Sequence, residues 1–337
     1  MNADLFVSAA QDIDNELRRV FNENQSLDTH ALYGMLRYFF GYTDESLRPL
    51  TLSSGKRFRA ALTLIIADGY GARAEALQAA LAIELFHNFT LIHDDVEDHD
   101  EIRRNRPTVW KLWGVNHAIN SGDLLGLLAA RETALTEPNQ ARVLFDAYAK
   151  VIEGQYLDFE LSNAPCHTID RKDYMKMIAS KTGALIGAAA QVAGLAANQS
   201  VSECLQLRSY GDSLGTLFQL CDDYRSIWNT PNATGKDFHS DIREHKRTLP
   251  FFIAYANSSP TNRTRLGYLF SLDRALKEFE AAEAYKIIDE PLYQKEIRDL
   301  IVHYTDKALK AIEGLSLLAT HKHSLVGIAS SLAQDIS

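Results

Sequence analysis

The amino-acid sequence predicts an all-α fold, on three observations. Apolar residues recur at helical spacing along most of the chain, and no segment shows the clean alternation of a half-buried strand. The 337 residues include only 8 Pro and 18 Gly, whereas average usage would give about 17 and 24. Several of the apolar-periodic segments also run well past the length of an ordinary helix.

Each predicted helix is bounded by residues that turn the chain. Glycine, proline, asparagine and serine gather at 69–71, 163–165, 229–235 and 258–260, and Pro107 interrupts the pattern as well. Between these signals, and followed by shorter helices to the end of the chain, the periodicity places helices at 5–22, 29–40, 56–68, 74–98, 115–134, 140–161, 170–196, 201–228 and 249–257.

The segment 74–92 indicates how these helices are arranged. About two-thirds of its residues are apolar, so it needs neighbours on most sides, and the centre of a helical bundle provides them. No Gly/Ser-rich linker, charge block or solenoid repeat divides the chain. We therefore expect residues 1–337 to form a single all-helical domain.

Composition limits the classes of function. The chain is 46% hydrophobic and 23% charged, with a formal net charge of -9, which argues against nucleic-acid binding because phosphate backbones attract clustered positive charge. Phosphorylated small molecules remain possible ligands. Three scattered cysteines, no signal-peptide pattern and no apolar segment of membrane-spanning length predict a cytoplasmic protein without stable membrane insertion.

A cluster of carboxylates ends the 74–98 helix, in the run Asp94-Asp95-Val96-Glu97-Asp98. Asp94 and Asp98 lie one turn apart on the same helix face, where like charges repel. Mg²⁺ reverses that balance, since it binds carboxylate oxygens together with phosphate oxygens. A solvated acidic helix end is the alternative, but the strongly apolar helix before the cluster favours a metal site.

A second acidic pair, Asp222-Asp223, lies near the end of the 201–228 helix, with Gln219 one turn earlier. Alone, such a pair is common at helix ends. As the second pair on a second apolar helix, it predicts two acidic clusters that face each other across the bundle and hold several metal ions.

Basic residues accompany both acidic clusters: Lys56, Arg59, Arg103, Arg104, Lys236 and Lys246. Lys56 and Arg59 open a helix, whose free N–H groups and dipole favour phosphate. Charge balance would explain each group by itself. Together they predict a polyanion bound between metal ions and Lys/Arg side chains.

Other chemistries lack their motifs. Neither of the glycine-rich nucleotide loops, G-x-x-x-x-G-K-[ST] and G-x-G-x-x-G, is present. His87 and His93 are six residues apart on the apolar helix, a spacing that does not let them share one zinc ion. Taken alone, His87 is better explained as a hydrogen-bonded core histidine.

The ordered motifs resemble a known family. They are Gly55-Lys56-Arg57-x-Arg59, Glu84-x-x-His87, Asp94-Asp95-x-x-Asp98, Arg103-Arg104-x-Arg106-Pro107-Thr108, Gly122-Asp123, Gly154-Gln155, Lys181-Thr182-Gly183, Phe218-Gln219-x-x-Asp222-Asp223, Gly235-Lys236 and Asp241-x-x-Glu244-x-Lys246-x-Thr248-Leu249-Pro250. In this series, from Gly55 to Pro250, the chain is similar to the trans-isoprenyl diphosphate synthases, such as farnesyl and geranylgeranyl diphosphate synthases.

The resemblance implies a helical bundle around a deep apolar pocket, usually in a homodimer. It implies that isopentenyl diphosphate binds to Lys56, Arg59, His87 and Arg104. It implies that the allylic diphosphate binds to Arg103, Lys181, Thr182, Gln219, Lys236 and Lys246. Three Mg²⁺ ions per active site would be held by Asp94, Asp98 and Asp222.

The implied reaction is a head-to-tail condensation. Metal and cations neutralise the leaving diphosphate, the allylic C–O bond ionises, isopentenyl diphosphate attacks the carbocation, and a proton is lost. The chain departs from the family's pattern at Ser226, where a third acid is common, and in the following loop at Asp237, His239 and His245, where Pro or Gly is frequent. These departures bear on metal affinity and loop closure.

Phe89, five residues before Asp94, bears on product length. In the family, an aromatic residue there forms a floor for the growing tail, so the resemblance implies a geranylgeranyl (C20) product, with farnesyl (C15) as the alternative. A helical wheel places Thr90 nearer the Asp94 face, and an ordinary core role for Phe89 stays open.

Two further alternatives concern the activity itself. Ser226 favours a catalytically silent partner subunit, whereas intact acidic and lysine motifs oppose it. A class I terpene cyclase also ionises a diphosphate, but Lys56, Arg59 and Arg104 imply a second diphosphate site that it would not need.

Overall fold

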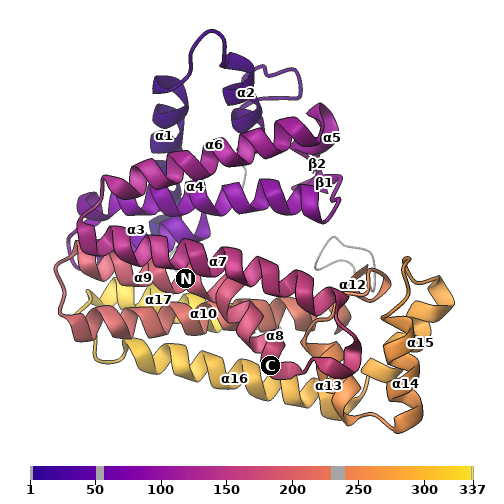
Figure 1. The fold of residues 1–337 in the computed structure, drawn as a ribbon. Coiled ribbons are helices and arrows are strands. Elements are labelled where there is room, and N and C mark those ends of the chain that lie inside the picture. Colours follow the sequence, from indigo (N-terminus) through magenta and orange to yellow (C-terminus); the bar gives the residue numbers. More distant parts are fainter. Residues whose placement is uncertain (1–2, 51–56, 229–239, 335, 337) are drawn as a thin grey trace.

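The computed structural model, which describes residues 3–50, 57–228, 240–334 and 336, confirms the all-α fold (Figure 1). The first helices are α1 (Ala3–Glu23), α2 (His30–Phe39), α3 (Phe58–Asp68), α4 (Arg73–Glu97), α5 (Val109–Trp113), α6 (Val115–Ala134) and α7 (Pro138–Asn163). A 3₁₀ turn, η1 (Cys166–Thr168), precedes a long helical run composed of α8 (Arg171–Ile178), the π-helical segment η2 (Ala179–Gly183) and α9 (Ala184–Ala196). The remaining helices are α10 (Val201–Trp228), α12 (Ser240–Arg243), α13 (Leu249–Asn257), α14 (Pro260–Leu269), α15 (Glu278–Ile288), α16 (Pro291–Ile312) and α17 (Ala319–Ala333).

The predicted helices agree closely with these bounds, and α6, α10 and α13 match them residue for residue. Two differences matter for the site. Helix α3 begins at Phe58, because Arg57 adopts a left-handed φ of 47° and cannot continue a helix. The predicted helix 170–196 is interrupted by η2, which contains Lys181 and Thr182, and such π segments frequently occur at functional sites.

A small hairpin was not predicted. Strands β1 (Ile102–Arg103) and β2 (Arg106–Pro107) pair antiparallel directly after α4. Arg104 and Asn105 form the turn with φ of 53° and 59°, as a two-residue type I′ turn requires. The hairpin is too short to show an alternating pattern, and it fixes the two arginines that follow the acidic end of α4.

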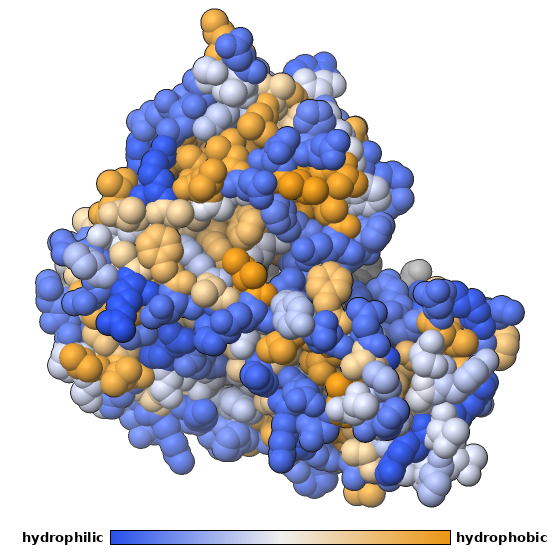
Figure 2. All heavy atoms as spheres, in the orientation of Figure 1, coloured by the Kyte–Doolittle hydropathy of each residue, from blue (hydrophilic) through white to orange (hydrophobic). Residues whose placement is uncertain are grey.

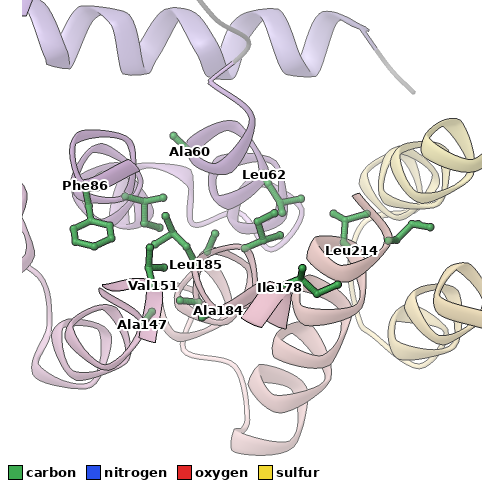
Figure 3. Packing of buried hydrophobic residues seen from close by; sticks show 14 of the residues in the cluster. Ala60, Leu62, Phe86, Ala147, Val151, Ile178, Ala184, Leu185 and Leu214 are labelled. Carbon is green, nitrogen blue, oxygen red and sulfur yellow. The ribbon is translucent and has the colours of Figure 1, made fainter. Parts of the chain in front are cut away.

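The core has α4 and α9 near its centre. Helix α4 packs against α6, α3 and α9, and α10 packs against α9 and α16. Figure 3 shows side chains of several helices meeting there, including Leu62 of α3, Phe86 of α4, Val151 of α7 and Leu185 of α9. The buried apolar residues form one cluster from Ala9 to Ile336.

Close backbone contacts hold the π segment. A Cβ on Gly154 of α7 would lie 2.3 Å from the backbone N of Lys181, and one on Gly215 of α10 would lie 2.7 Å from the Cα of Gly183. Only glycine lets backbones approach so closely. The segment that carries Lys181 is therefore fixed between α7 and α10.

Of the helices that the structure describes, none combines the length and apolar character needed to cross a membrane. Cys166, Cys204 and Cys221 are free thiols, and all three are buried.

Candidate active site

The acidic end of α4 places Asp94 in a half-buried position and Asp98 at the surface. Burial raises the pKa of Asp94 to about 7, against an ordinary value of 3.8, and the nearby Lys181 only partly offsets that rise. A carboxylate in such a position lacks the positive charge that would stabilise it. This electrostatic deficit is what a bound cation would remove.

Lys181, from the π segment, is the positive charge that acts most strongly on Asp94 and on Asp98. Its Nζ lies 2.6 Å from Oδ2 of Asp158 on α7, and the charges of Asp94 and Asp98 also act on it. The structure therefore brings three of the predicted residues, Asp94, Asp98 and Lys181, into one region. Asp158 was not predicted as a site residue, because a single acidic residue among other charged residues of a helix does not stand out in the sequence.

In the second acidic pair, the two carboxylates have different environments. Asp222 is exposed, whereas Asp223 is buried and accepts hydrogen bonds from Tyr174 Oη, from Gln219 Nε2 at 3.0 Å and from the Leu249 backbone N–H at 3.1 Å. Asp223 therefore ties α10 to α8 and to the start of α13. Burial and Asp223 raise the pKa of Tyr174, and Asp158 and Asp222 add to the effect, so both carboxylates lie near this hydroxyl group.

Two other predicted residues lie between the π segment and α10. The Thr182 hydroxyl group donates to Gln219 Oε1 at 3.4 Å, and the amide nitrogen of Gln219 is bound to Asp223. Ser226 Oγ donates to the carbonyl of Asp223 at 2.9 Å, so it closes a local helical contact and supplies no carboxylate.

A separate cationic site lies two turns earlier on α4. Arg59 Nη1 of α3 donates to His87 Nε2 at 3.0 Å, and burial together with the Arg59 charge holds the pKa of His87 well below its ordinary value. His87 is therefore neutral and accepts the hydrogen bond. Among the described residues, Arg59 has no carboxylate partner, and its Nε is buried without a hydrogen bond.

Two of the neighbouring arginines, Arg57 and Arg103, are neutralised by carboxylates. Arg57 pairs with Asp14 at 3.0 Å and with Glu84 at 3.3 Å, and Arg103 pairs with Asp95. The guanidinium of Arg104 lies 5.6 Å from the ring centre of Phe39, and its charge reaches His87. Arg59 thus supplies positive charge that the described acids do not balance, as an anion site requires. The Arg57 network was not predicted either, because it joins residues far apart in sequence.

The two sites share one face of a helix. His87, Asp94 and Asp98 are separated by seven and then four residues, so they lie along the same side of α4. Two turns of helix place the cationic and the acidic sites about 10 Å apart. That separation suits two anionic groups bound side by side.

A cleft of about 1260 Å³ opens beside the acidic end. It is lined by Asp98, Gln155, Asp158 and Lys246, and extends past Arg247 toward α13 and α14. Lys246 pairs with Glu244 at 2.9 Å. The predicted site residues Lys56 and Lys236 lie outside the described residues, as do Asp237 and His239.

His245 occupies a position with φ of 59°, which explains why glycine is usual there in the family that the sequence resembles. Its Nε2 is buried and has no hydrogen-bond partner among the residues that the structure describes, and burial lowers the pKa of the ring.

Phe89 lies on the α6 side of α4. Its ring centre is 4.8 Å from that of His93 and 5.4 Å from that of Phe86, and a Cβ on Gly126 would touch it at 3.4 Å. Phe86 stacks in turn on Tyr148 of α7 at 3.9 Å. These aromatic rings form a partly buried layer below the acidic end. The place of Tyr148 in this layer was not predicted from the sequence.

The acidic end fits Mg²⁺ by its donor chemistry. No three His, Cys, Asp or Glu side chains converge on one point within the described part of the chain. Mg²⁺ does not need such a cage, since it is commonly bound by one or two carboxylates together with substrate phosphates and water. Asp94 and Asp98 supply that pair, with the uncompensated charge noted above.

The raised pKa of Asp94 predicts a pH dependence of stability. Folded Asp94 keeps its proton up to about pH 7, whereas the unfolded residue loses it near its ordinary value of 3.8. Unfolding therefore releases a proton between these values, so the free energy of unfolding of the metal-free protein falls as pH rises from about 4 to about 7. Thermal unfolding between pH 5 and pH 8 measures this dependence of stability on pH. In Asp94→Asn the dependence should be weaker. An unchanged dependence in that variant would contradict the raised pKa of Asp94.

The all-helical bundle thus combines an acidic cluster beside a lysine with a separate cationic site two turns away, an arrangement that can bind anionic groups. Comparison with known proteins identifies the family. The model of the polyprenyl synthetase family matches residues 42–288. The chain therefore belongs to this family and is a trans-prenyltransferase of isoprenoid biosynthesis.

Individual relatives differ in their products. A geranylgeranyl diphosphate synthase of Mycobacterium tuberculosis is 38% identical over 260 residues, 75% of this chain and 73% of that protein. A (2E,6E)-farnesyl diphosphate synthase of Mycobacterium bovis is 37% identical over 249 residues, 72% of this chain and 68% of that protein. The crystal structure of a polyprenyl synthetase from Streptomyces coelicolor has a TM-score of 0.88 and 28% identity, covering 98% of this chain and 99% of that chain.

Proposed function

We propose that this prenyltransferase condenses isopentenyl diphosphate with an allylic diphosphate and releases geranylgeranyl diphosphate. The observation that carries the proposal is a pair of sites along α4. At one, half-buried Arg59 of α3, which has no carboxylate partner among the described residues, lies beside neutral His87; at the other, the acidic end of α4 lies beside Lys181. One diphosphate fits each site. Farnesyl diphosphate is the alternative product.

The residues of each site have distinct roles in this proposal. Arg59, His87 and Arg104 hold isopentenyl diphosphate, together with Lys56. Lys181, Thr182 and Gln219 hold the allylic diphosphate, with Arg103, Lys236 and Lys246 as further cations. Because Lys181 is a fixed donor, it is already in place when negative charge develops on the leaving diphosphate.

Mg²⁺, when bound by Asp94 and Asp98 with Asp222, would neutralise the leaving diphosphate as a Lewis acid. Half-burial of Asp94 limits the access of water on its side of the site. No nucleophilic side chain is needed, because the double bond of isopentenyl diphosphate is the nucleophile.

The proposal is tested with the purified chain alone, given Mg²⁺, isopentenyl diphosphate and an allylic diphosphate. We expect a condensation product, resolved by chain length. Absence of any product would favour a silent subunit that modulates another synthase. A hydrocarbon formed without isopentenyl diphosphate would instead indicate a terpene cyclase.

Phe89→Ala tests the product length. The Phe89 ring packs against α6 below the acidic end, so removing it opens space where a growing tail would be stopped. We expect products at least one C5 unit longer than those of the wild type, measured by chromatography of the dephosphorylated alcohols. Leu135→Ala, an exposed change at the end of α6, is the control. An unchanged distribution in Phe89→Ala would mean that the ring is ordinary core.

We also propose a homodimer. Hydrophobic side chains gather over α6 and α7 in Figure 2, and Ile119 and Leu127 of α6 and Phe145, Ile152 and Tyr156 of α7 are exposed. The last three lie on one face of α7 at spacings of seven and four residues, typical of a helix that packs against another. Sedimentation equilibrium tests the proposal, and a monomer mass would contradict it.

A further inference from the structure

Helix α7 carries a pair, Gly154-Gln155, that the sequence singled out without giving it a role, and Asp158 follows one turn later. Gln155 and Asp158 both line the cleft beside the acidic end. Each of the three residues contacts an element that bears the proposed site: η2 in the case of Gly154 and Asp158, and α4 in the case of Gln155.

The side-chain contact fixes the ammonium group of Lys181. Asp158 Oδ2 lies 2.6 Å from Lys181 Nζ, and the two side chains are 37% and 27% exposed, so the pair is partly shielded from water. Burial alone would lower the pKa of Lys181, but the charges of Asp158 and then of Asp94 outweigh burial and raise it. The lysine is thus charged and has a definite partner.

The backbone contact fixes the other end of the same residue. A Cβ on Gly154 would lie 2.3 Å from the N and 2.6 Å from the Cα of Lys181, so α7 touches the π segment directly. Gly154 and Asp158 are four residues apart and therefore lie on one face of α7. That face holds the backbone and the ammonium group of Lys181 at once.

A third contact connects α7 with the acidic end of α4. Gln155 Nε2 donates to Glu97 Oε2 at 2.7 Å, and Glu97 lies within the Asp94–Asp98 run. One turn of α7 therefore sets the position of Lys181 relative to the carboxylates proposed to bind metal.

We propose that Asp158 is a positioning residue that keeps the Lys181 ammonium group off Asp94 and Asp98 and available to the allylic diphosphate. This rests on the proposed function. Both carboxylates are close enough to act on Lys181, yet the ion pair that the described residues form is with Asp158. An ammonium group has three N–H donors, so pairing with Asp158 leaves donors for a diphosphate. Without Asp158, the strongest remaining attraction on Lys181 is toward Asp94 and Asp98, where it would compete with Mg²⁺.

Asp158→Asn tests the proposal through binding, without turnover. Calorimetric titration with inorganic diphosphate in Mg²⁺ should show binding about tenfold weaker than in the wild type, as for other residues that orient a ligand-binding group. The KM for the allylic diphosphate should rise by a similar factor, and that for isopentenyl diphosphate should stay the same. Asp158→Glu, which keeps the carboxylate, should recover part of the loss. Glu153→Gln, an exposed acid on the same helix paired with Lys150, is the matched control and should bind normally.

The double variant distinguishes positioning from direct contact. If Asp158 acts through Lys181, Asp158→Asn with Lys181→Gln binds no more weakly than Lys181→Gln alone, whereas additive losses would overturn the proposal. Normal binding in Asp158→Asn with weak binding in Lys181→Gln would overturn this inference and leave the proposed function intact. Normal binding in Lys181→Gln would overturn the role of Lys181 in the proposed function itself.

Discussion

Asp94→Ala and Asp98→Ala should each lower turnover by about a hundredfold or more, the usual effect of removing a group that stabilises transition-state charge. The two carboxylates lie one turn apart near Lys181 and are the pair proposed above to bind Mg²⁺. Without either carboxylate, Mg²⁺ would be held less well, and less of the negative charge on the departing diphosphate would be neutralised. Steady-state rates at saturating Mg²⁺ and substrates measure the effect.

Neither variant should unfold the protein. Burial raises the pKa of Asp94, so its charged form destabilises the metal-free fold, and alanine removes that cost. The thermal midpoint of Asp94→Ala should therefore equal or exceed that of the wild type above pH 7. Glu101→Gln, an exposed acid paired with Lys111, is the control for loss of negative charge near the site. Near-normal turnover in either aspartate variant would refute the metal role.

The helices were predictable because each has a periodic apolar face and turn residues at its ends. The agreement for α10 is an example. A turn signal in the sequence follows Trp228, and the 28-residue helix is apolar enough to be buried on most sides in its middle. The split of the predicted helix 170–196 was not predictable, because the π segment arises from tertiary contacts. Gly154 of α7 and Gly215 of α10 make close backbone contacts with η2, and both are distant in sequence from Lys181.

For the candidate site, the sequence indicated which residue types carry charge and left open which of them are free to bind. Arg57 and Arg59 look equivalent in sequence. In the structure, Arg57 is neutralised by Asp14 and Glu84, whereas Arg59 contacts neutral His87. Likewise Asp222 and Asp223 look like a matched pair, but Asp223 is a buried structural acceptor. In each case, hydrogen-bond or ion-pair partners from elements distant in sequence determine whether the charged group is free to bind a ligand.

Arg59→Gln should raise the KM for isopentenyl diphosphate by about a hundredfold, because a hydrogen bond to a charged group contributes up to about 3 kcal/mol. The acidic end, two turns away on α4, remains intact in this variant. The allylic diphosphate should therefore still bind and ionise, seen as slow release of inorganic diphosphate without isopentenyl diphosphate. The two half-reactions are thus separable by one substitution, as two independent diphosphate sites require.

The variant's stability gives an independent check on the same assignment. A half-buried guanidinium without a described carboxylate partner costs folding free energy, and burial lowers the pKa of Arg59 to about 10. Glutamine removes that cost, so the substrate-free Arg59→Gln protein should unfold at an equal or higher temperature, while isopentenyl diphosphate should stabilise it less than it stabilises the wild type. Arg48→Gln, at an exposed pair with Asp44, controls for loss of one positive charge. An unchanged KM, or equal stabilisation of both proteins by isopentenyl diphosphate, would mean that the charge at Arg59 serves the fold and not a substrate.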